Sequence, residues 1–164
     1  MRTISLIASA AVAATLAIAP PANAHRPDGV WKTRNHVEDR ARSQKGAPYR
    51  SGGTSPRGFD CSGFTRWTFS ELNVSLPHSS TDQFKLARRD RVKRIWKRKN
   101  LKTGDLVFHK TTSARVGHAG IYIGDGKFIS STSSEGVAIN SIYDRYYWGR
   151  RWVGATRLVV TQNR

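Results

Sequence analysis

The sequence predicts an α+β domain, with helices in the first part of the chain and antiparallel strands in the second. Apolar residues recur at three- and four-residue spacing at Phe64, Trp67 and Leu72, which is the period of an amphipathic helix. From Leu106 onward the apolar residues fall in short segments rich in β-branched and aromatic side chains, as strands are. The dipeptide Asp125-Gly126 separates two of these segments and is a strong signal for a β-hairpin.

Residues 1–24 are typical of a secretory signal peptide. They have a basic residue at Arg2, an apolar or small run from Ile4 to Pro20, and a small-x-small ending at Ala22–Ala24. The alternative, a transmembrane anchor, needs roughly 20 apolar residues to span a bilayer, and this run is shorter. We therefore expect cleavage after this ending and a mature chain that is secreted and either extracellular or associated with the cell wall.

One domain is expected after this segment, because the remaining chain is long enough for one core and too short for two ordinary domains. Residues 25–34 are polar and contain proline and glycine, so they are predicted to form a flexible leader. The domain then covers residues 35–164. Its first element is a short surface helix over Asn35–Gly46, where acidic residues come early, basic residues come late and a glycine ends the run.

A second helix is predicted over Cys61–Asn73, after a loop whose glycines and prolines exclude regular structure. Asp60 immediately precedes this helix and is a suitable N-cap. A further short helix, capped by Ser80 or Thr81, is expected to run toward Ala87. The helical part of the domain therefore ends before the strand-like segments begin.

Strand-like segments make up the second half of the domain. They follow a strongly basic run, Lys85–Lys102, which holds ten Lys or Arg residues and one acid. The predicted strands are Leu106–His109, Gly117–Ile123, Lys127–Ser131, Gly136–Ile139 and Trp152–Val160. Helices followed by antiparallel strands are the element order of an α+β domain.

Cys61 is the only cysteine of the chain, so it cannot form an internal disulfide. Such a thiol is buried and inert, paired with another molecule, or reactive. Its predicted place at the N-terminus of a helix favours the reactive interpretation, because free backbone N–H groups and the helix macrodipole lower the pKa of a thiol. The same N–H groups can hold an oxyanion, and Gly63 leaves room for a substrate backbone.

A cysteine hydrolase also needs a base within hydrogen-bond reach of its thiol. The chain has five histidines, and His118 differs from the others because it opens a predicted strand beside the small residues Ala119 and Gly120. A lone histidine is more often a surface residue or a hydrogen-bonded structural residue than a catalytic one. Among the five, His118 is the best candidate for the base.

Four stretches together resemble the NlpC family of bacterial cell-wall cysteine peptidases: GAPYRSGGTSPRGFDCSGF, LPHSSTDQ, LKTGDLVF and GHAGIYIGDGKFI. The resemblance covers about residues 35–158, and its two central motifs are Asp60–Gly63 and Gly117–Tyr122. It implies a papain-like fold, in which a nucleophile-bearing helix packs on an antiparallel β-sheet. It also implies that Cys61 is the nucleophile and His118 the base of a peptidoglycan hydrolase. Such enzymes typically cut the bond between D-glutamate and a diamino acid in stem peptides.

The resemblance also implies roles for three neighbours of the nucleophile. Tyr49 matches a tyrosine that lies near the nucleophile, while Asp60 and Ser62 match positions that shape substrate binding. From the residues alone, Tyr49 can equally pack within its glycine-rich loop, and Asp60 can simply cap the helix. The sequence therefore leaves a substrate-binding role and a structural role open for these residues.

The third catalytic position of the family is occupied here by Ser130, twelve residues after His118. The family usually has His there, and sometimes Asn, Gln or Glu. A hydroxyl can accept a hydrogen bond from an imidazole N–H, but it lacks the charge that would stabilise an imidazolium. A three-residue hairpin loop places Ser130 on the face of His118, whereas a two-residue turn places Ser131 there. A water or Asn140 can also take this role, and Ser130 can merely fill space.

The implied reaction passes through a thioester on the cysteine, which water then hydrolyses. An amidase or an acyltransferase on the same scaffold would form the same thioester, so both stay open as alternatives. A third alternative is a catalytically inactive cell-wall-binding protein, which the serine at position 130 favours. No cofactor or metal is expected, since the histidines are scattered and one cysteine gives no zinc-ligand spacing.

The formal net charge of +17 predicts attraction to polyanions, and it falls by one when the signal, which holds Arg2 and no acid, is removed. Besides peptidoglycan, the expected partners are anionic cell-wall polymers, bound through Lys85–Lys102; the alternative is a solvated face without a partner. Basic residues with interleaved aromatics also suit nucleic acids, but the secretory signal and the Cys–His pair argue against such a partner. The protein is expected to be a monomer.

Overall fold

The computed structural model describes residues 29–88 and 92–158. The predicted signal peptide and residues 25–28 of the predicted leader lie outside this part of the chain. The helices are α1 (Gly29–Ser43), α2 (Cys61–Ser70) and α3 (Ser80–Lys85), with short 3-10 helices η1 (Leu86–Arg88), η2 (Arg98–Asn100) and η3 (Gly149–Arg151). The strands are β1 (Thr54–Ser55), β2 (Gly58–Phe59), β3 (Val92–Ile95), β4 (Leu106–His109), β5 (His118–Tyr122), β6 (Lys127–Thr132), β7 (Gly136–Ser141) and β8 (Trp152–Leu158). No helix among the described residues is long and apolar enough to cross a lipid bilayer.

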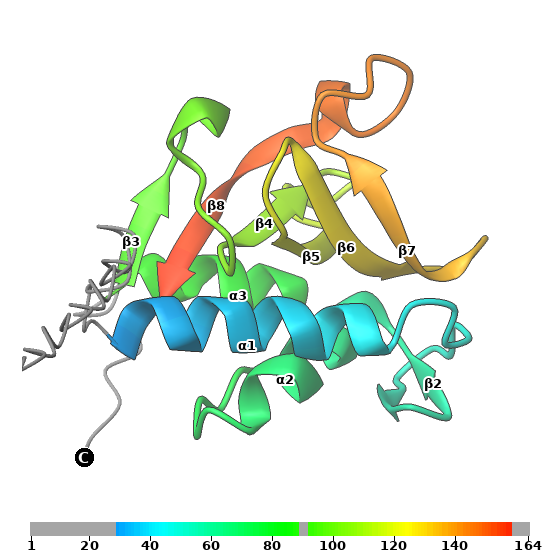
Figure 1. The fold of residues 1–164 in the computed structure, drawn as a ribbon. Coiled ribbons are helices and arrows are strands. Elements are labelled where there is room, and N and C mark those ends of the chain that lie inside the picture. The colour runs from blue at the N-terminus through cyan, green and yellow to red at the C-terminus, as the bar shows by residue number, and fades with distance from the viewer. Residues whose placement is uncertain (1–28, 89–91, 159–164) are drawn as a thin grey trace, which may run out of the picture.

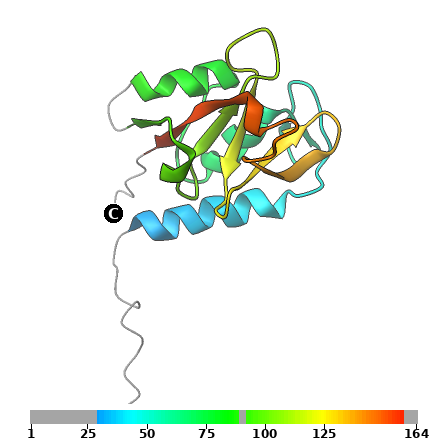
Figure 2. The same cartoon turned by 90° about the horizontal axis from the view of Figure 1, so that it is seen from above.

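Six strands form one antiparallel sheet, and the three α-helices lie on one face of it. The strand order is β3-β8-β4-β5-β6-β7, and every neighbouring pair is antiparallel. Figure 1 shows α1, α2 and α3 together beneath this sheet, and Figure 2 shows α1 and α3 on opposite sides of the helical layer. β1 and β2 form a separate two-stranded ribbon beside α2. The predicted α+β fold, with the nucleophile-bearing helix packed on an antiparallel sheet, is therefore confirmed.

Both faces of the sheet are covered, so its central strands are buried on both sides. The face toward the helices packs against Phe64 and Phe69 of α2. The opposite face carries a second cluster around Phe128, to which the partly buried Trp148 is packed. Every residue of β4 is buried, His109 included. Burial on both sides explains why β4 begins with the continuous apolar run Leu106–Phe108 rather than with alternating apolar and polar residues.

Several elements differ from those predicted. The cap of α3 is Ser79, and not Ser80 or Thr81. α1 begins at Gly29, ahead of the expected start at Asn35, so residues 29–34 belong to a helix and not to a leader. α2 ends at Ser70, before the predicted end at Asn73. The basic segment contains an unpredicted strand, β3, which lies at the sheet edge and pairs with β8. Its pairing uses backbone groups, and basic side chains are common on edge strands because they discourage further pairing.

The loop between β5 and β6 decides which residues of β6 share a face with the predicted base. The loop has three residues, Gly124–Gly126, since the register pairs Ile121 with Ile129. This register places Ser130 on the face of the base and Ser131 on the other face. The three-residue alternative is therefore confirmed, and the two-residue turn is wrong.

Candidate active site

Cys61 is the first residue of α2, and capping contacts fix where that helix begins. The Asp60 carboxylate accepts hydrogen bonds from the Gly63 N–H at 2.6 Å and from the Ser62 hydroxyl at 2.9 Å. Its second oxygen lies 2.8 Å from Nε2 of His78, which belongs to the loop before α3. Asp60 is therefore the N-cap of α2, and it also ties the start of this helix to the α2–α3 connection.

Gly63 serves the packing of a loop rather than the access of a substrate. It is buried, and a Cβ at this position would overlap the carbonyl oxygen of Gly53. The same carbonyl accepts a hydrogen bond from the Asp60 N–H at 3.0 Å. The expectation that Gly63 leaves room for a substrate backbone is therefore wrong, because the missing side chain lets the glycine-rich loop close on the first turn of α2.

Burial raises the pKa of the Cys61 thiol, in contrast to the lowered value expected from the helix N-terminus. Desolvation is the largest cause, and the charge of Asp60 acts in the same direction. The backbone N–H groups of Ala119, Ser62 and Cys61 itself favour the thiolate, but they do not outweigh burial. The thiol is therefore protonated at neutral pH and needs a base to become a nucleophile.

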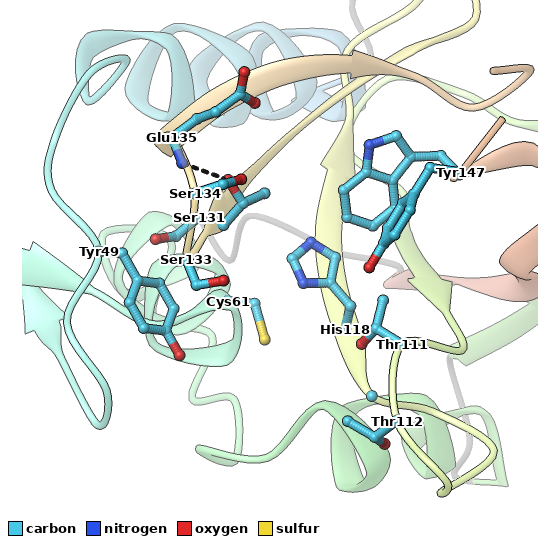
Figure 3. A pocket seen from close by; sticks show the side chains of 13 residues that line it. Tyr49, Cys61, Thr111, Thr112, His118, Ser131, Ser133, Ser134, Glu135 and Tyr147 are labelled. Atoms are coloured by element: carbon cyan, nitrogen blue, oxygen red, sulfur yellow. Dashed lines mark hydrogen bonds between the residues drawn. The ribbon is translucent and has the colours of Figure 1, made fainter.

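His118 is the first residue of β5 and lies beside Cys61 in one pocket (Figure 3). It is 7% exposed, and burial lowers the pKa of its imidazole to about 4. The ring is therefore neutral at neutral pH and can accept the proton of a thiol. Nε2 is buried and has no hydrogen-bond partner among the described residues, which leaves Nδ1 as the nitrogen available to the thiol.

The pocket that holds both residues has a volume of about 570 Å³. Figure 3 shows Cys61 and His118 in its centre, with Tyr49 on one side and Tyr147 on the other. Most of the lining side chains carry a hydroxyl group, which suits a polar, peptide-like ligand. The full lining comprises Tyr49, Cys61, Thr111, Thr112, Gly117, His118, Ser131, Thr132, Ser133, Ser134, Glu135, Tyr147 and Trp148.

The predicted site residues divide into two groups in the structure. Tyr49, Cys61 and His118 line the pocket, and Tyr49 is 40% exposed there. Asp60 and Ser62 do not line it; they bind each other and fix the start of α2. The role of these two residues in substrate binding, implied by the family resemblance, stays a prediction.

Ser130 is fully buried and its hydroxyl has no partner within the described part of the chain, so no direct hydrogen bond joins it to His118. Asn140 likewise makes no hydrogen bond to that imidazole. Ser131 lies on the other face, where its hydroxyl donates to the carbonyl of Phe59 at 2.7 Å. Ser131 therefore fastens β6 to β2, and the alternative in which it orients His118 is wrong.

A turn between β7 and β8 closes the side of the pocket behind His118. The Asp144 carboxylate accepts hydrogen bonds from the backbone N–H groups of Tyr146, Tyr147 and Trp148, at 3.1, 2.7 and 3.0 Å. These bonds, that from Trp148 first, lower the pKa of Asp144. The centroid of the Trp148 ring lies 4.9 Å from that of His118. One carboxylate thus holds the turn that packs an aromatic ring on the candidate base.

Gln83 is a residue of the site's framework that sequence reasoning missed. It is fully buried in α3 and donates hydrogen bonds to the carbonyls of Ser62 at 3.0 Å and Pro77 at 2.8 Å. Its side-chain oxygen accepts a bond from the Thr65 hydroxyl at 2.8 Å. A glutamine in a polar segment gives no pattern that would single it out, because its importance depends on burial between two helices.

Replacing Gln83 with leucine is expected to lower the free energy of unfolding by about 1–3 kcal/mol. The substitution keeps a side chain of similar size but removes the donor of the partly buried Pro77 carbonyl, and an unsatisfied group of this kind costs about 1–3 kcal/mol. The Ser62 carbonyl still accepts a hydrogen bond from the Thr65 hydroxyl at 2.9 Å. Urea denaturation followed by circular dichroism measures the change. Gln44→Leu is the control, because Gln44 is partly exposed and its side chain donates to the exposed Ser43 hydroxyl; its effect should stay within about 0.5 kcal/mol. Equal effects of the two substitutions would contradict the role of Gln83.

A protonated thiol becomes a nucleophile only when a neighbouring base removes its proton. Here the thiol starts a helix, the base starts a strand, and the packing of that helix on that sheet brings them to one pocket. This is the arrangement of the papain-like cysteine peptidases. Within residues 29–88 and 92–158, no group of three or more His, Cys, Asp or Glu side chains is placed to hold a metal ion.

The chain belongs to the NlpC/P60 family, whose family model matches residues 46–157. An NlpC/P60 family protein from Bacillus cereus has a solved structure with a TM-score of 0.66 and 28% sequence identity, covering 78% of this chain and 40% of that chain. The NlpC/p60 domain of the peptidoglycan hydrolase SagA has a TM-score of 0.62 and 25% identity, covering 76% of this chain and 98% of that chain. Both the family and the papain-like fold implied by the sequence resemblance are thereby confirmed.

Curated relatives share more than a third of the aligned residues with this chain. The probable endopeptidase NlpC homolog of Haemophilus influenzae is 38% identical over 115 residues, which is 70% of this chain and 57% of the relative. The murein DD-endopeptidase MepS/murein LD-carboxypeptidase of Escherichia coli is 36% identical over 127 residues, or 77% and 63%. The gamma-DL-glutamyl hydrolase of Bacillus subtilis is 36% identical over 128 residues, or 76% and 30%. The matched region therefore spans less than two thirds of each of these relatives.

Proposed function

We propose that this protein is a cysteine peptidase that hydrolyses the stem peptides of peptidoglycan. The observation that carries the proposal is the placement of a protonated thiol and a neutral imidazole in one hydroxyl-lined pocket. The names of the relatives support the substrate class, since they include murein endopeptidases and a glutamyl hydrolase. The protein acts outside the cytoplasm, where peptidoglycan lies, and the signal-like start of the sequence supports this location.

The reaction begins with proton transfer from the Cys61 thiol to Nδ1 of His118. The thiolate attacks the scissile carbonyl carbon, and backbone N–H groups at the start of α2 stabilise the oxyanion. Collapse of the tetrahedral intermediate forms a thioester and breaks the C–N bond, while the His118 imidazolium gives its proton to the leaving amine. Water, deprotonated by the again neutral His118, then hydrolyses the thioester and regenerates the thiol.

The bond that we propose is the one between D-glutamate and the diamino acid of the stem peptide. The family resemblance supports this choice, as does the similarity to a gamma-DL-glutamyl hydrolase. Other relatives are described as DD-endopeptidases, so cleavage at a D-alanyl bond is the competing outcome of the test. If no bond is cut, the protein is an inactive wall-binding protein.

Digestion of purified peptidoglycan by the native protein and by its Cys61→Ala variant tests the proposal, with released fragments identified by mass spectrometry. Fragments that end at D-glutamate, released by the native protein alone, are expected. Fragments that end at D-alanine would support the peptidase activity but show that a different bond is cut from the one proposed. Equal release by both proteins, or release by neither with wall binding intact, would overturn the proposal.

We also propose that exposed lysines of the basic segment hold the protein to anionic cell-wall polymers. Two of its arginines are engaged in the fold, since Arg94 donates to the carbonyl of Phe84 and Arg98 to that of Gly149. Four exposed lysines remain around β3 and η2 and supply the proposed surface: Lys93, Lys97, Lys99 and Lys102. Such exposed charges attract polyanions and are screened by salt.

Replacing these four lysines with glutamine is expected to lower retention on whole cell walls at least threefold at low ionic strength. The difference should vanish in 1 M salt, because the Debye length is then about 3 Å and charges farther apart are screened from one another. Co-sedimentation with walls measures retention, and hydrolysis of a short soluble stem peptide serves as the control that should not change. Unchanged retention in low salt would contradict this role of the basic segment.

A further inference from the structure

His109 is a buried titratable residue for which the proposed reaction has no use. It ends β4, is fully buried, and neither ring nitrogen has a hydrogen-bond partner among the described residues. Its ring stacks on Phe128 with centroids 4.9 Å apart and an interplanar angle of 29°. Trp148 and Trp152 meet the ring edge-on at 5.1 and 5.9 Å. A polar ring thus lies in an aromatic enclosure without a visible partner, which is unusual for a buried polar group.

His109 lies directly opposite His118 in the pairing of β4 with β5. The two ring centroids are 6.4 Å apart. Nε2 of His118 and the hydroxyl of Ser130 are also buried and without partners in the described chain. All three side chains belong to one face of the sheet, because Ser130 shares the face of His118 in the β5–β6 register. Three unpaired polar side chains therefore gather behind the candidate base.

Gly120 lets the side chains behind the candidate base approach one another closely. It follows His118 by two residues on the same face, and the register of the sheet sets it opposite Val107 of β4. A Cβ at Gly120 would lie 2.8 Å from the Phe128 ring and 3.0 Å from Cβ of Ser130. The absence of a side chain thus lets the Phe128 ring reach across β5 to His109 and leaves Ser130 close to the strand of the base.

We propose that one internal water joins Nε2 of His118 to His109 and Ser130, and that His109 is the positioning residue of the base. A direct hydrogen bond requires heavy atoms about 3 Å apart. The His109 and His118 ring centroids are 6.4 Å apart, a separation that two hydrogen bonds through one water can span. A buried water typically makes about three hydrogen bonds, which matches the three unpaired groups. The inference rests on the proposed function only in that His118 is taken as the base of the reaction.

The water accepts a hydrogen bond from the Nε2–H of His118, donates one to a ring nitrogen of His109, and shares one with the Ser130 hydroxyl. Fixing the proton on Nε2 leaves Nδ1 unprotonated and turned to the thiol, which is the tautomer that a general base needs. Burial, with the nearby His118 and Arg98 charges, lowers the pKa of His109 to about 3, so its ring stays neutral and keeps a nitrogen free to accept.

A His109→Phe variant tests the proposal, because phenylalanine keeps an aromatic ring against Phe128 and removes both nitrogens. The rate of Cys61 alkylation by iodoacetamide at pH 7 is expected to fall at least tenfold, with its pH dependence moved to higher pH. Imidazole 15N spectra are expected to show that His118 loses its preference for the Nε2–H tautomer. Trp152→Phe is the packing control, which changes the enclosure without removing the nitrogens and should leave both readouts unchanged.

A second substitution separates positioning from packing. Adding Ser130→His to His109→Phe supplies an imidazole on the same face of the sheet, and it is expected to restore alkylation to within about threefold of the native rate. No recovery, or an unchanged rate and tautomer in His109→Phe alone, would overturn the proposal. Both readouts are independent of peptidoglycan, so the native protein failing to release wall fragments would overturn the proposed function and leave this inference standing.

Discussion

A His118→Gln variant is expected to hydrolyse a soluble stem peptide about 10³-fold more slowly than the native protein, measured as kcat/KM. Glutamine keeps a polar side chain of similar reach but cannot take up the proton of the Cys61 thiol. Because burial raises the pKa of that thiol, little thiolate forms at neutral pH without a base. Separation of the peptide products by liquid chromatography gives the rates.

The matched control for this variant is His36→Gln, at an exposed position of α1 where the imidazole pairs with Glu71. It changes the same residue type away from the pocket and should leave kcat/KM within about twofold of the native value. Circular dichroism of both variants checks that the fold is kept. A loss of less than tenfold in His118→Gln would exclude this residue as the base.

The second large effect is a steep loss of stability in mild acid. Burial lowers the pKa of His109 to about 3 and that of His118 to about 4, from an ordinary value of 6.5. Below pH 6.5 the unfolded chain binds protons at both residues, whereas the folded chain does not until the pH approaches 4. Unfolding is therefore coupled to proton uptake, and the free energy of unfolding falls by up to about 1.4 kcal/mol per pH unit for each histidine.

Urea denaturation at several pH values between 7 and 4.5 measures this slope. Removing one of the two groups with His109→Phe is expected to reduce the histidine contribution to the slope by about half. Parallel stability curves for the native protein and His109→Phe would mean that the His109 ring takes up protons as readily in the folded chain as in the unfolded one.

The main elements of the fold follow from patterns that the sequence displays locally. α2 could be predicted because Asp60 precedes an apolar repeat of helical period, and its cap forms as expected. Most strands of the central sheet could be predicted because their segments are rich in β-branched and aromatic residues, and because Asp125-Gly126 marks the turn between two of them. β3 could not be predicted, since residues Val92–Ile95 do not alternate between apolar and polar side chains. They form a strand only through backbone pairing with β8. A pairing between segments so distant in sequence leaves no local trace.

The candidate site was partly accessible to the same reasoning. Cys61 and His118 could be found because their motifs are specific, and the structure brings both to one pocket. The direction of the thiol pKa was predicted wrongly, because it depends on how deeply the packed sheet and helices bury the sulfur. Gln83 and His109 were missed for a related reason, since neither belongs to a recognisable sequence motif. Burial gives Gln83 its hydrogen-bond partners and leaves the His109 ring without any among the described residues, and neither could be predicted from the sequence.

The sheet separates two hydrophobic clusters, and each reacting group depends on a different one. Cys61 moves with α2, whose Phe64 and Phe69 belong to the cluster on the helical face. The His118 ring is held by Trp148 and its neighbours, which pack on the opposite face. A slight slip of one layer relative to the other changes the alignment of thiol and imidazole, and a displacement of about 1 Å can cost about 10²-fold in rate. The catalytic rate is thus more sensitive than the fold to a shift between the two layers. On heating, activity should therefore be lost at a lower temperature than the cooperative unfolding transition.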